Sequence, residues 1–163
     1  MFTVSRQIEI DAGHRVPYHD AQCRFLHGHR WKIVAEVAAP ELVVADPSRA
    51  DSGMVVDFGV IKRVLMTVIH ERFDHRMILW DQDPLLAEDS VVDYGGDDPT
   101  LHGVLRRAGI EASIQVVPVI PTSEGLARYW AELVAPHLGP LQLAAFHVWE
   151  TPNSKASFIP RRG

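Results

Sequence analysis

The sequence predicts an α+β fold in a single domain. Residues 2–12 and 29–38 alternate between apolar and polar side chains, which is typical of half-buried strands. Residues 59–72 and the stretch after 121–123 instead repeat apolar residues every three to four positions, which is typical of amphipathic helices. With 163 residues and 47% hydrophobic content, the chain is long enough to bury one sizeable core.

Composition narrows the class of protein. The formal net charge is −5, and no basic cluster is larger than a pair such as Arg161-Arg162, so a nucleic-acid surface is not expected. No apolar run is long enough to span a bilayer, and no secretory leader pattern is visible at the N-terminus. Cys23 is the only cysteine, which excludes an intrachain disulfide and favours a cytoplasmic setting.

The first two strands enclose a loop rich in reactive side chains. Antiparallel pairing of residues 2–12 with 29–38 would bring His14, His27 and His29 together at one end of the sheet. The connecting loop, residues 15–26, carries the free thiol of Cys23. We therefore expect the thiol near the histidines.

The two helices have recognisable starts. Asp57 is placed to cap the helix over 59–72, whose apolar stripe is Val60, Ile61, Val64, Leu65, Val68 and Ile69. Thr122 or Ser123 can cap the second helix, and Glu124 falls in its first turn. Its inner face is expected to carry Leu126, Trp130, Leu133 and Val134. Further strands are expected at 113–119, 141–150 and 156–159.

Residues 81–111 have the character of an insertion in the single domain 1–163. They contain a turn at Tyr94-Gly95-Gly96 and a short helix near 100–108 that ends at Gly109. The same segment is acidic, and we interpret that run as a solvated loop, not a metal site. Its acidic residues are Glu88, Asp89, Asp93, Asp97 and Asp98.

His27 and His29 are the strongest functional signal. Side chains at i and i+2 point to the same face of a strand, so the two imidazoles can share one metal ion, with His14 as the third ligand. Three protein ligands leave one coordination position open, as in catalytic zinc sites. Zinc is the default metal for three imidazoles, although iron, cobalt or nickel would also fit. His19, in the middle of the loop, is a weaker candidate for the third ligand.

Five other residues have both a functional and a structural interpretation. Cys23 is either a small buried apolar residue or a thiolate activated by a nearby metal. Asp74-His75 is either a helix C-terminal feature or a proton relay. Glu150 ends an apolar strand and is either exposed or holds a guanidine-like group through two parallel hydrogen bonds, and Glu124 offers the same chemistry.

Six ordered motifs covering nearly the whole chain resemble the 6-pyruvoyl and 6-carboxy tetrahydropterin synthases. The resemblance implies a tunnelling fold, in which an antiparallel sheet carries two helices on one face. It also implies trimers whose sheets join into a barrel, two trimers stacked as a hexamer, and active sites between subunits. The motifs are His14, Cys23-x-x-x-His27-Gly-His29, Gly53-Met54-Val55-Val56-Asp57-Phe58, Asp74-His75, Pro121-Thr122-Ser123-Glu124 and Trp149-Glu150-Thr151.

The resemblance also implies roles for these residues on 7,8-dihydroneopterin triphosphate. His14, His27 and His29 would bind Zn²⁺, which would acidify the side-chain hydroxyls of the substrate, and Cys23 would be the general base. Asp74 and His75 would complete the proton relay, and Glu150 would join the relay or contact the pterin. Glu124, with Thr122 or Ser123, would hold the pyrimidine edge, and either glutamate could make the bidentate contact. The basic residues nearest these motifs, as candidates for the triphosphate, are Arg15, Arg24 and Lys155.

Two products fit this resemblance. The carboxy enzymes yield 6-carboxytetrahydropterin, acetaldehyde and triphosphate on the route to queuosine and other 7-deazaguanines, and the pyruvoyl enzymes eliminate triphosphate on the route to tetrahydrobiopterin. The short Cys-x-x-x-His spacing favours the carboxy lyase. A zinc and pterin-binding module without catalysis is the non-enzymatic alternative. A cupin-like metal enzyme is disfavoured because the nearest glutamate after His29 is Glu36 and no second histidine strand follows.

Overall fold

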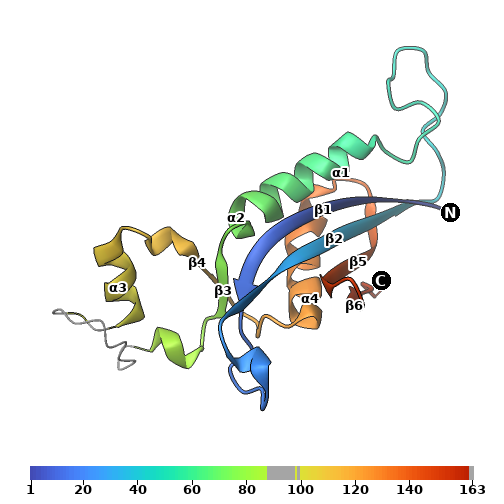
Figure 1. Ribbon diagram of the computed structural model, residues 1–163. Helices are drawn as coiled ribbons and strands as arrows, with labels where there is room; N and C mark the ends of the chain where they lie inside the picture. The colour runs from blue at the N-terminus through green and yellow to red at the C-terminus, as the bar shows by residue number, and fades with distance from the viewer. Residues whose placement is uncertain (88–97, 99, 162–163) are drawn as a thin grey trace.

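The computed structural model describes residues 1–87, 98 and 100–161. Its centre is a six-stranded sheet in the order β4-β3-β1-β2-β5-β6, with the long helices packed on one side (Figure 1). The strands are β1 Phe2–His14, β2 His27–Ala39, β3 Met77–Trp80, β4 Ile114–Val117, β5 Gln142–Thr151 and β6 Ser154–Phe158. The helices are α1 Phe58–Leu65, α2 Glu71–Phe73, α3 Leu101–Ala108 and α4 Ser123–Val134. Single turns are η1 Gln22–Arg24, η2 Met66–His70, η3 Pro84–Leu86, η4 Glu111–Ser113 and η5 Ala135–His137.

The long hairpin of β1 and β2 confirms the predicted antiparallel pair. Its register runs from Phe2 opposite Ala39 to His14 opposite His27. Alternate residues face the helices and are buried, and the others face the open side of the sheet. The buried row is Ile8, Ile10 and Ala12 of β1 with Trp31, Ile33, Ala35 and Val37 of β2.

The α+β class is confirmed, but the sheet is mixed and not antiparallel throughout. β3 runs parallel to both β1 and β4, whereas β1, β2, β5 and β6 are antiparallel neighbours. The sequence did not indicate β3 because its four residues show no alternation. Ile78 and Leu79 are both fully buried, so neighbouring residues on opposite sides of this strand are apolar.

Both predicted helices are present and cover the same face. The first runs without a break over 58–73, through α1, the π-helical turn η2 and α2, and Asp57 caps it by accepting the Gly59 N–H at 2.5 Å. Thr122 caps α4 by accepting the Gly125 N–H at 3.1 Å. Their apolar sides join the buried row of the hairpin in one core, contributed by Ile61, Leu65, Ile69 and Phe73 and by Leu126, Trp130 and Val134.

Within the described part of 81–111, the helix over 101–108 lies beyond β3 and β4 and away from the hairpin (Figure 1). The predicted helix is present as α3, capped by Thr100 and ended by Gly109 in the left-handed conformation, with φ 70°. Asp98 accepts hydrogen bonds from Thr100 and Arg106 at the start of this helix. The turn at 94–96 and the other acidic residues, Glu88, Asp89, Asp93 and Asp97, lie outside the described residues. That the segment is an insertion stays a prediction.

No helix in the described ranges is long and apolar enough to cross a membrane.

Candidate metal centre

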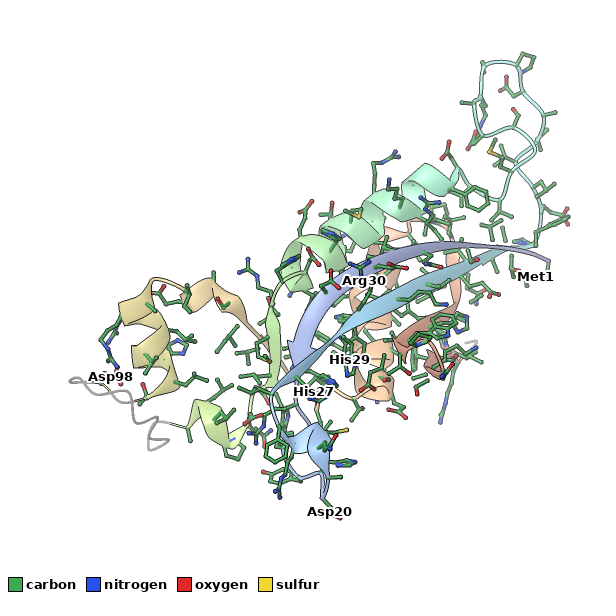
Figure 2. All side chains as sticks on the ribbon, viewed as in Figure 1. Met1, Asp20, His27, His29, Arg30 and Asp98 are labelled. Carbon is green, nitrogen blue, oxygen red and sulfur yellow. The ribbon has the colours of Figure 1, made fainter. Side chains whose placement is uncertain are left out.

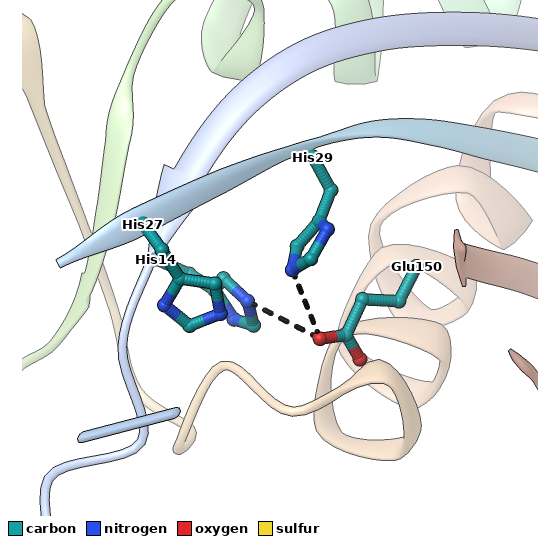
Figure 3. A group of neighbouring side chains, drawn as sticks. All are labelled: His14, His27, His29 and Glu150. Atoms are coloured by element: carbon teal, nitrogen blue, oxygen red, sulfur yellow. Dashed lines mark ion pairs between the residues drawn. The ribbon is translucent and has the colours of Figure 1, made fainter. Parts of the chain in front are cut away.

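Three histidines meet at the end of the β1–β2 hairpin. His14 continues the buried row of β1 and is 1% exposed, and His27 and His29 continue the buried row of β2. The alternation that builds the core thus also points these imidazoles to one side of the sheet. Their ring centroids lie 4.5 to 5.3 Å apart, as Figure 3 shows. Figure 2 shows His27 and His29 at the end of β2 that leads into the loop carrying Asp20.

Backbone carbonyls fix which nitrogen each ring presents. His14 Nδ1 lies 2.6 Å from the Pro121 carbonyl oxygen, and His27 Nδ1 lies 2.8 Å from that of Phe25. A carbonyl only accepts, so each Nδ1 carries the proton and each Nε2 keeps its lone pair. Histidines that bind metals commonly donate their other ring N–H in this way. Pro121 therefore has a role that the sequence did not indicate.

Glu150 completes the cluster from the far end of β5. Its Oε1 atom lies 3.1 Å from His29 Nε2 and 3.5 Å from His14 Nε2 (Figure 3). Ser123 Oγ, at the start of α4, donates to Oε2 at 2.7 Å and holds the carboxylate toward the rings. One ligand atom from each of the three histidines and Glu150 lies within 4.8 Å of the others, so the group has the size of a metal site.

Burial prepares the imidazoles to bind a cation. Desolvation lowers the pKa of His14 and of His29 below the usual histidine value, although the Glu150 carboxylate opposes the shift in both. Neutral imidazole is the form that ligates metal. The Nε2 atoms of His14 and His29 are buried, and the polar atom that the described residues bring to both is Glu150 Oε1, at 3.5 and 3.1 Å. A divalent metal would satisfy both atoms, and the donor set fits one.

A hollow of about 480 Å³ opens beside this cluster, where β5 leaves β2. The two strands pair from Lys32 opposite Trp149 onward, so β2 continues to His27 without a β5 partner. His29 and Glu150 line one part of the hollow, and Lys32 and Trp149 line another. A substrate in this hollow would therefore meet His29 and Glu150 of the cluster directly.

Asp74 and His75 contact each other and do not belong to the imidazole cluster. The chain turns here with His75 at φ 56°, and His75 Nδ1 bonds Asp74 Oδ2 at 2.8 Å. The other Asp74 oxygen accepts the Asp11 N–H at 2.9 Å. Burial would raise the pKa of Asp74, but the Asp11 N–H and His75 outweigh it and hold the pKa below the usual value. The His75 side chain is 79% exposed.

His75 borders a second hollow, of about 570 Å³, which His29 also lines. Its floor includes Gly13 and Gly28, which face each other across the hairpin. A Cβ on Gly13 would lie 2.5 Å from the end of the Met77 side chain, so a larger residue here would displace that flexible side chain. The hollow therefore gives His75 access to the backbone beside the metal ligands.

Cys23 lies in η1, in the loop that joins the two ligand-bearing strands. Its side chain is half-buried, and its carbonyl accepts the Val16 N–H at 2.8 Å. His19, in the same loop, is exposed and accepts the Ala21 N–H at 3.0 Å, so it is not part of the cluster. The structure thus places the thiol in the expected loop and separates His19 from the ligands.

The remaining predicted residues have varied positions. Thr122 is the α4 cap and Ser123 orients Glu150, whereas Glu124 is exposed. Of the basic residues considered for an anion, Arg24 packs on Phe25, and Arg15 pairs with the buried Asp83. Lys155 lies over Trp149, as does Lys32, which the sequence did not single out because a lysine in an alternating strand has no distinctive pattern.

Comparison with known proteins agrees with this architecture. The chain is 31% identical over 156 residues to the 6-carboxy-5,6,7,8-tetrahydropterin synthase of Rickettsia conorii, covering 94% of this chain and 96% of that protein. It is 27% identical to the protein of that name from Haemophilus influenzae, over 94% and 96% of the two chains. Among solved structures, an uncharacterized protein from Wolinella succinogenes is 25% identical with a TM-score of 0.75, covering 98% of each chain.

The 6-pyruvoyl tetrahydropterin synthase of Caenorhabditis elegans shares the fold, at 19% identity and a TM-score of 0.60, over 98% of this chain and 96% of that chain. The family model described as 6-pyruvoyl tetrahydropterin synthase matches residues 3–160. With a match over nearly its whole length, the chain belongs to the 6-pyruvoyl tetrahydropterin synthase family of lyase-type enzymes.

Proposed function

We propose that this chain is a zinc-dependent lyase that converts 7,8-dihydroneopterin triphosphate into 6-carboxy-5,6,7,8-tetrahydropterin, acetaldehyde and triphosphate. The observation that carries the proposal is the group of three imidazoles and Glu150, whose ligand atoms lie within 4.8 Å of one another, with His29 and Glu150 lining an open hollow. The names of the full-length relatives support the carboxy product. The product is the 6-carboxy precursor of queuosine and other 7-deazaguanines.

In this proposal His14, His27 and His29 hold the zinc ion through Nε2. When bound, zinc supplies a Lewis acid that lowers the pKa of the substrate's side-chain hydroxyls. The carbonyls of Pro121 and Phe25 keep His14 and His27 in the ligating tautomer.

Glu150 is the better placed of the two glutamates for the pterin. Its carboxylate lines the hollow beside His29 and is oriented by Ser123, whereas Glu124 is exposed on the first turn of α4. A carboxylate can accept two parallel N–H bonds from the guanidine-like edge of a pterin. We therefore assign that contact to Glu150, with Thr122 and Ser123 holding its surroundings in place.

Cys23 serves as the general base, and Asp74 with His75 completes the proton relay from a neighbouring subunit. Within one chain the dyad does not belong to the imidazole cluster, and His75 is largely exposed. An exposed dyad transfers protons selectively only once another surface covers it and excludes water. A second copy of the chain, bringing its Cys23 loop over His75, would provide that surface.

Lys32 and Lys155 are the proposed contacts for the triphosphate. Their Nζ atoms lie 3.8 and 5.4 Å from the centroid of the Trp149 ring, beside the hollow that His29 and Glu150 line. The described residues include no carboxylate within ion-pair distance of either lysine, although Glu9 faces Lys32 across the hairpin. Arg30, by contrast, is paired with Asp11.

The test is a product assay by mass spectrometry with zinc-loaded protein and 7,8-dihydroneopterin triphosphate. The proposal expects a 6-carboxy product with acetaldehyde, and no turnover by a His29→Ala control. A 6-pyruvoyl product would instead support the second candidate, which the description of the matching family model favours. Tight zinc and pterin binding without turnover would contradict both and indicate a binding module.

A further inference from the structure

A buried carboxylate next to the Cys23 loop has no part in the proposed chemistry. Asp83, at the start of η3, is 2% exposed. Its Oδ1 atom accepts the Leu85 N–H at 2.9 Å and so caps this short turn. A buried charge of this kind is costly unless an opposite charge meets it.

Arg15 supplies that charge. Its Nε atom lies 3.1 Å from Asp83 Oδ2, and its side chain is 16% exposed. Neither of these two atoms has a hydrogen-bond partner in the described part of the chain, so the ion pair is their main polar contact. The pair joins residues that are far apart in sequence and belong to different segments, the loop 15–26 and the segment 81–87.

The partner of Asp83 is linked directly to the thiol-bearing turn. Arg15 precedes Val16, whose N–H donates to the Cys23 carbonyl at 2.8 Å. The same loop also contacts the end of β3, just before Asp83, through the edge-to-face approach of Tyr18 and Trp80, with ring centroids 6.1 Å apart. The position of the Cys23 backbone therefore depends on what holds Arg15.

We propose that the Arg15–Asp83 ion pair is a positioning device that docks the Cys23 loop onto η3 and fixes the half-buried position of the thiol. Any effect of the ion pair on catalysis rests on the proposed function. Its effect on the position of the Cys23 loop is independent of that function. The pair also commits Arg15 to a buried carboxylate, so Arg15 positions the loop and does not bind phosphate.

Three variants of the full chain test the device. Asp83→Asn keeps an oxygen that can cap η3 but leaves Arg15 without its counter-charge. The double variant Arg15→Met with Asp83→Asn removes both charges. It should stay folded even if Asp83→Asn alone unfolds because its buried arginine is unpaired. Arg15→Lys keeps the positive charge and should therefore keep the Cys23 loop docked on η3. Glu132→Gln is the matched control, because it breaks an exposed pair with Arg128 at 2.8 Å.

Two readouts do not depend on activity. Cys23 is the only cysteine, so alkylation by iodoacetamide reports on this thiol alone. Hydrogen–deuterium exchange of residues 15–26 reports on the Val16 N–H bond. In Asp83→Asn and in the double variant we expect both rates to rise about tenfold or more toward those of the unfolded chain, with thermal unfolding still cooperative. Arg15→Lys and Glu132→Gln should remain near wild type.

Unchanged alkylation and exchange in the folded double variant would overturn the proposal, whatever the product assay shows. Where turnover is measurable, kcat should fall while KM stays within about twofold, because the base is misplaced and the binding hollow is not. A rise in KM alone would contradict the positioning role and return Arg15 to substrate binding. Failure of the product assay with the expected loop release would refute the proposed function only.

Discussion

At the scale of single residues, the position of His14 shows how one side chain serves both core and site. It is the last residue of the buried row of β1, yet the Pro121 carbonyl holds its ring so that Nε2 faces His29 and Glu150. Burial lowers its pKa, which favours the neutral imidazole that can ligate a metal. The site therefore needs few further polar groups to favour a metal ion.

The ligand assignment predicts which histidine substitutions remove metal. His29→Ala deletes one of three imidazoles, and we expect bound zinc to fall from one equivalent to well below it at micromolar metal. His19→Ala is the matched control, because His19 lies in the loop outside the cluster. Metal content after gel filtration, measured by mass spectrometry, decides the matter. Equal loss in both variants would refute the assignment.

Glu150→Gln separates pterin binding from metal binding. If the carboxylate holds the pterin, zinc content should stay near wild type while KM rises roughly tenfold or more, because one charge-assisted bond is lost. Ser123 still has an oxygen to donate to in this variant. Zinc loss as severe as in His29→Ala would show instead that Glu150 is a fourth ligand.

The lowered pKa of Asp74 predicts how stability depends on pH. A carboxyl whose folded pKa lies below its unfolded value contributes stability that is fully present above about 3.8 and is lost as the pH falls through the folded value. The difference in the free energy of unfolding between wild type and Asp74→Asn should therefore shrink as the pH falls below 3.8. Urea titrations of both proteins from pH 3 to pH 6 measure it. If the difference in the free energy of unfolding instead grew as the pH fell, the pKa of Asp74 would be raised in the folded state and not lowered.

At the scale of elements, the start of α4 carries a stability role and a site role at adjacent positions. Thr122 caps the helix, and Ser123 donates to Glu150. The Asp57 side chain that caps α1 accepts the Gly59 N–H, and Asp57 is not a member of the histidine and Glu150 cluster.

This contrast predicts that two cap substitutions differ in function and not in stability. Asp57→Ala and Thr122→Ala should each lower the free energy of unfolding by about 1 kcal/mol. Only Thr122→Ala should also raise KM for the pterin substrate, because a frayed first turn releases Ser123 from Glu150. Denaturant titration combined with steady-state kinetics compares the two. If both variants had the same KM, the contact of Ser123 with Glu150 would not depend on the Thr122 cap.

At the scale of the whole molecule, an incomplete relay in one chain predicts a shared active site. Cys23→Ala and His75→Ala proteins should each lose about 100-fold or more in turnover. Suppose that each site combines Cys23 of one copy with His75 of another. When the two inactive proteins are dissociated and reassembled together, about a quarter of the sites should then contain both an intact Cys23 and an intact His75, so about a quarter of wild-type activity should return. No recovery would place both residues in one subunit's site.

The sequence alone determined a good part of this protein. Alternation at 2–12 and 29–38, apolar periodicity at 59–72 and the capping residues Asp57 and Thr122 are local patterns, and local chain geometry is enough to interpret them. The pairing of His14 with the His27 and His29 strand follows from the same alternation. The sequence did not predict β3, because a four-residue strand that is buried on both sides shows no alternation of apolar and polar residues.

Only the tertiary structure decided which distant groups meet. The register that ends β5 beside His29 places Glu150, and not Glu124, against the imidazoles. The segment between β4 and α4 brings the Pro121 carbonyl to His14, and η3 brings Asp83 to Arg15. These contacts join residues more than 60 positions apart, and their geometry depends on how the helices and strands pack. Local periodicity carries no information about such packing, so the sequence could name the side chains but not their partners.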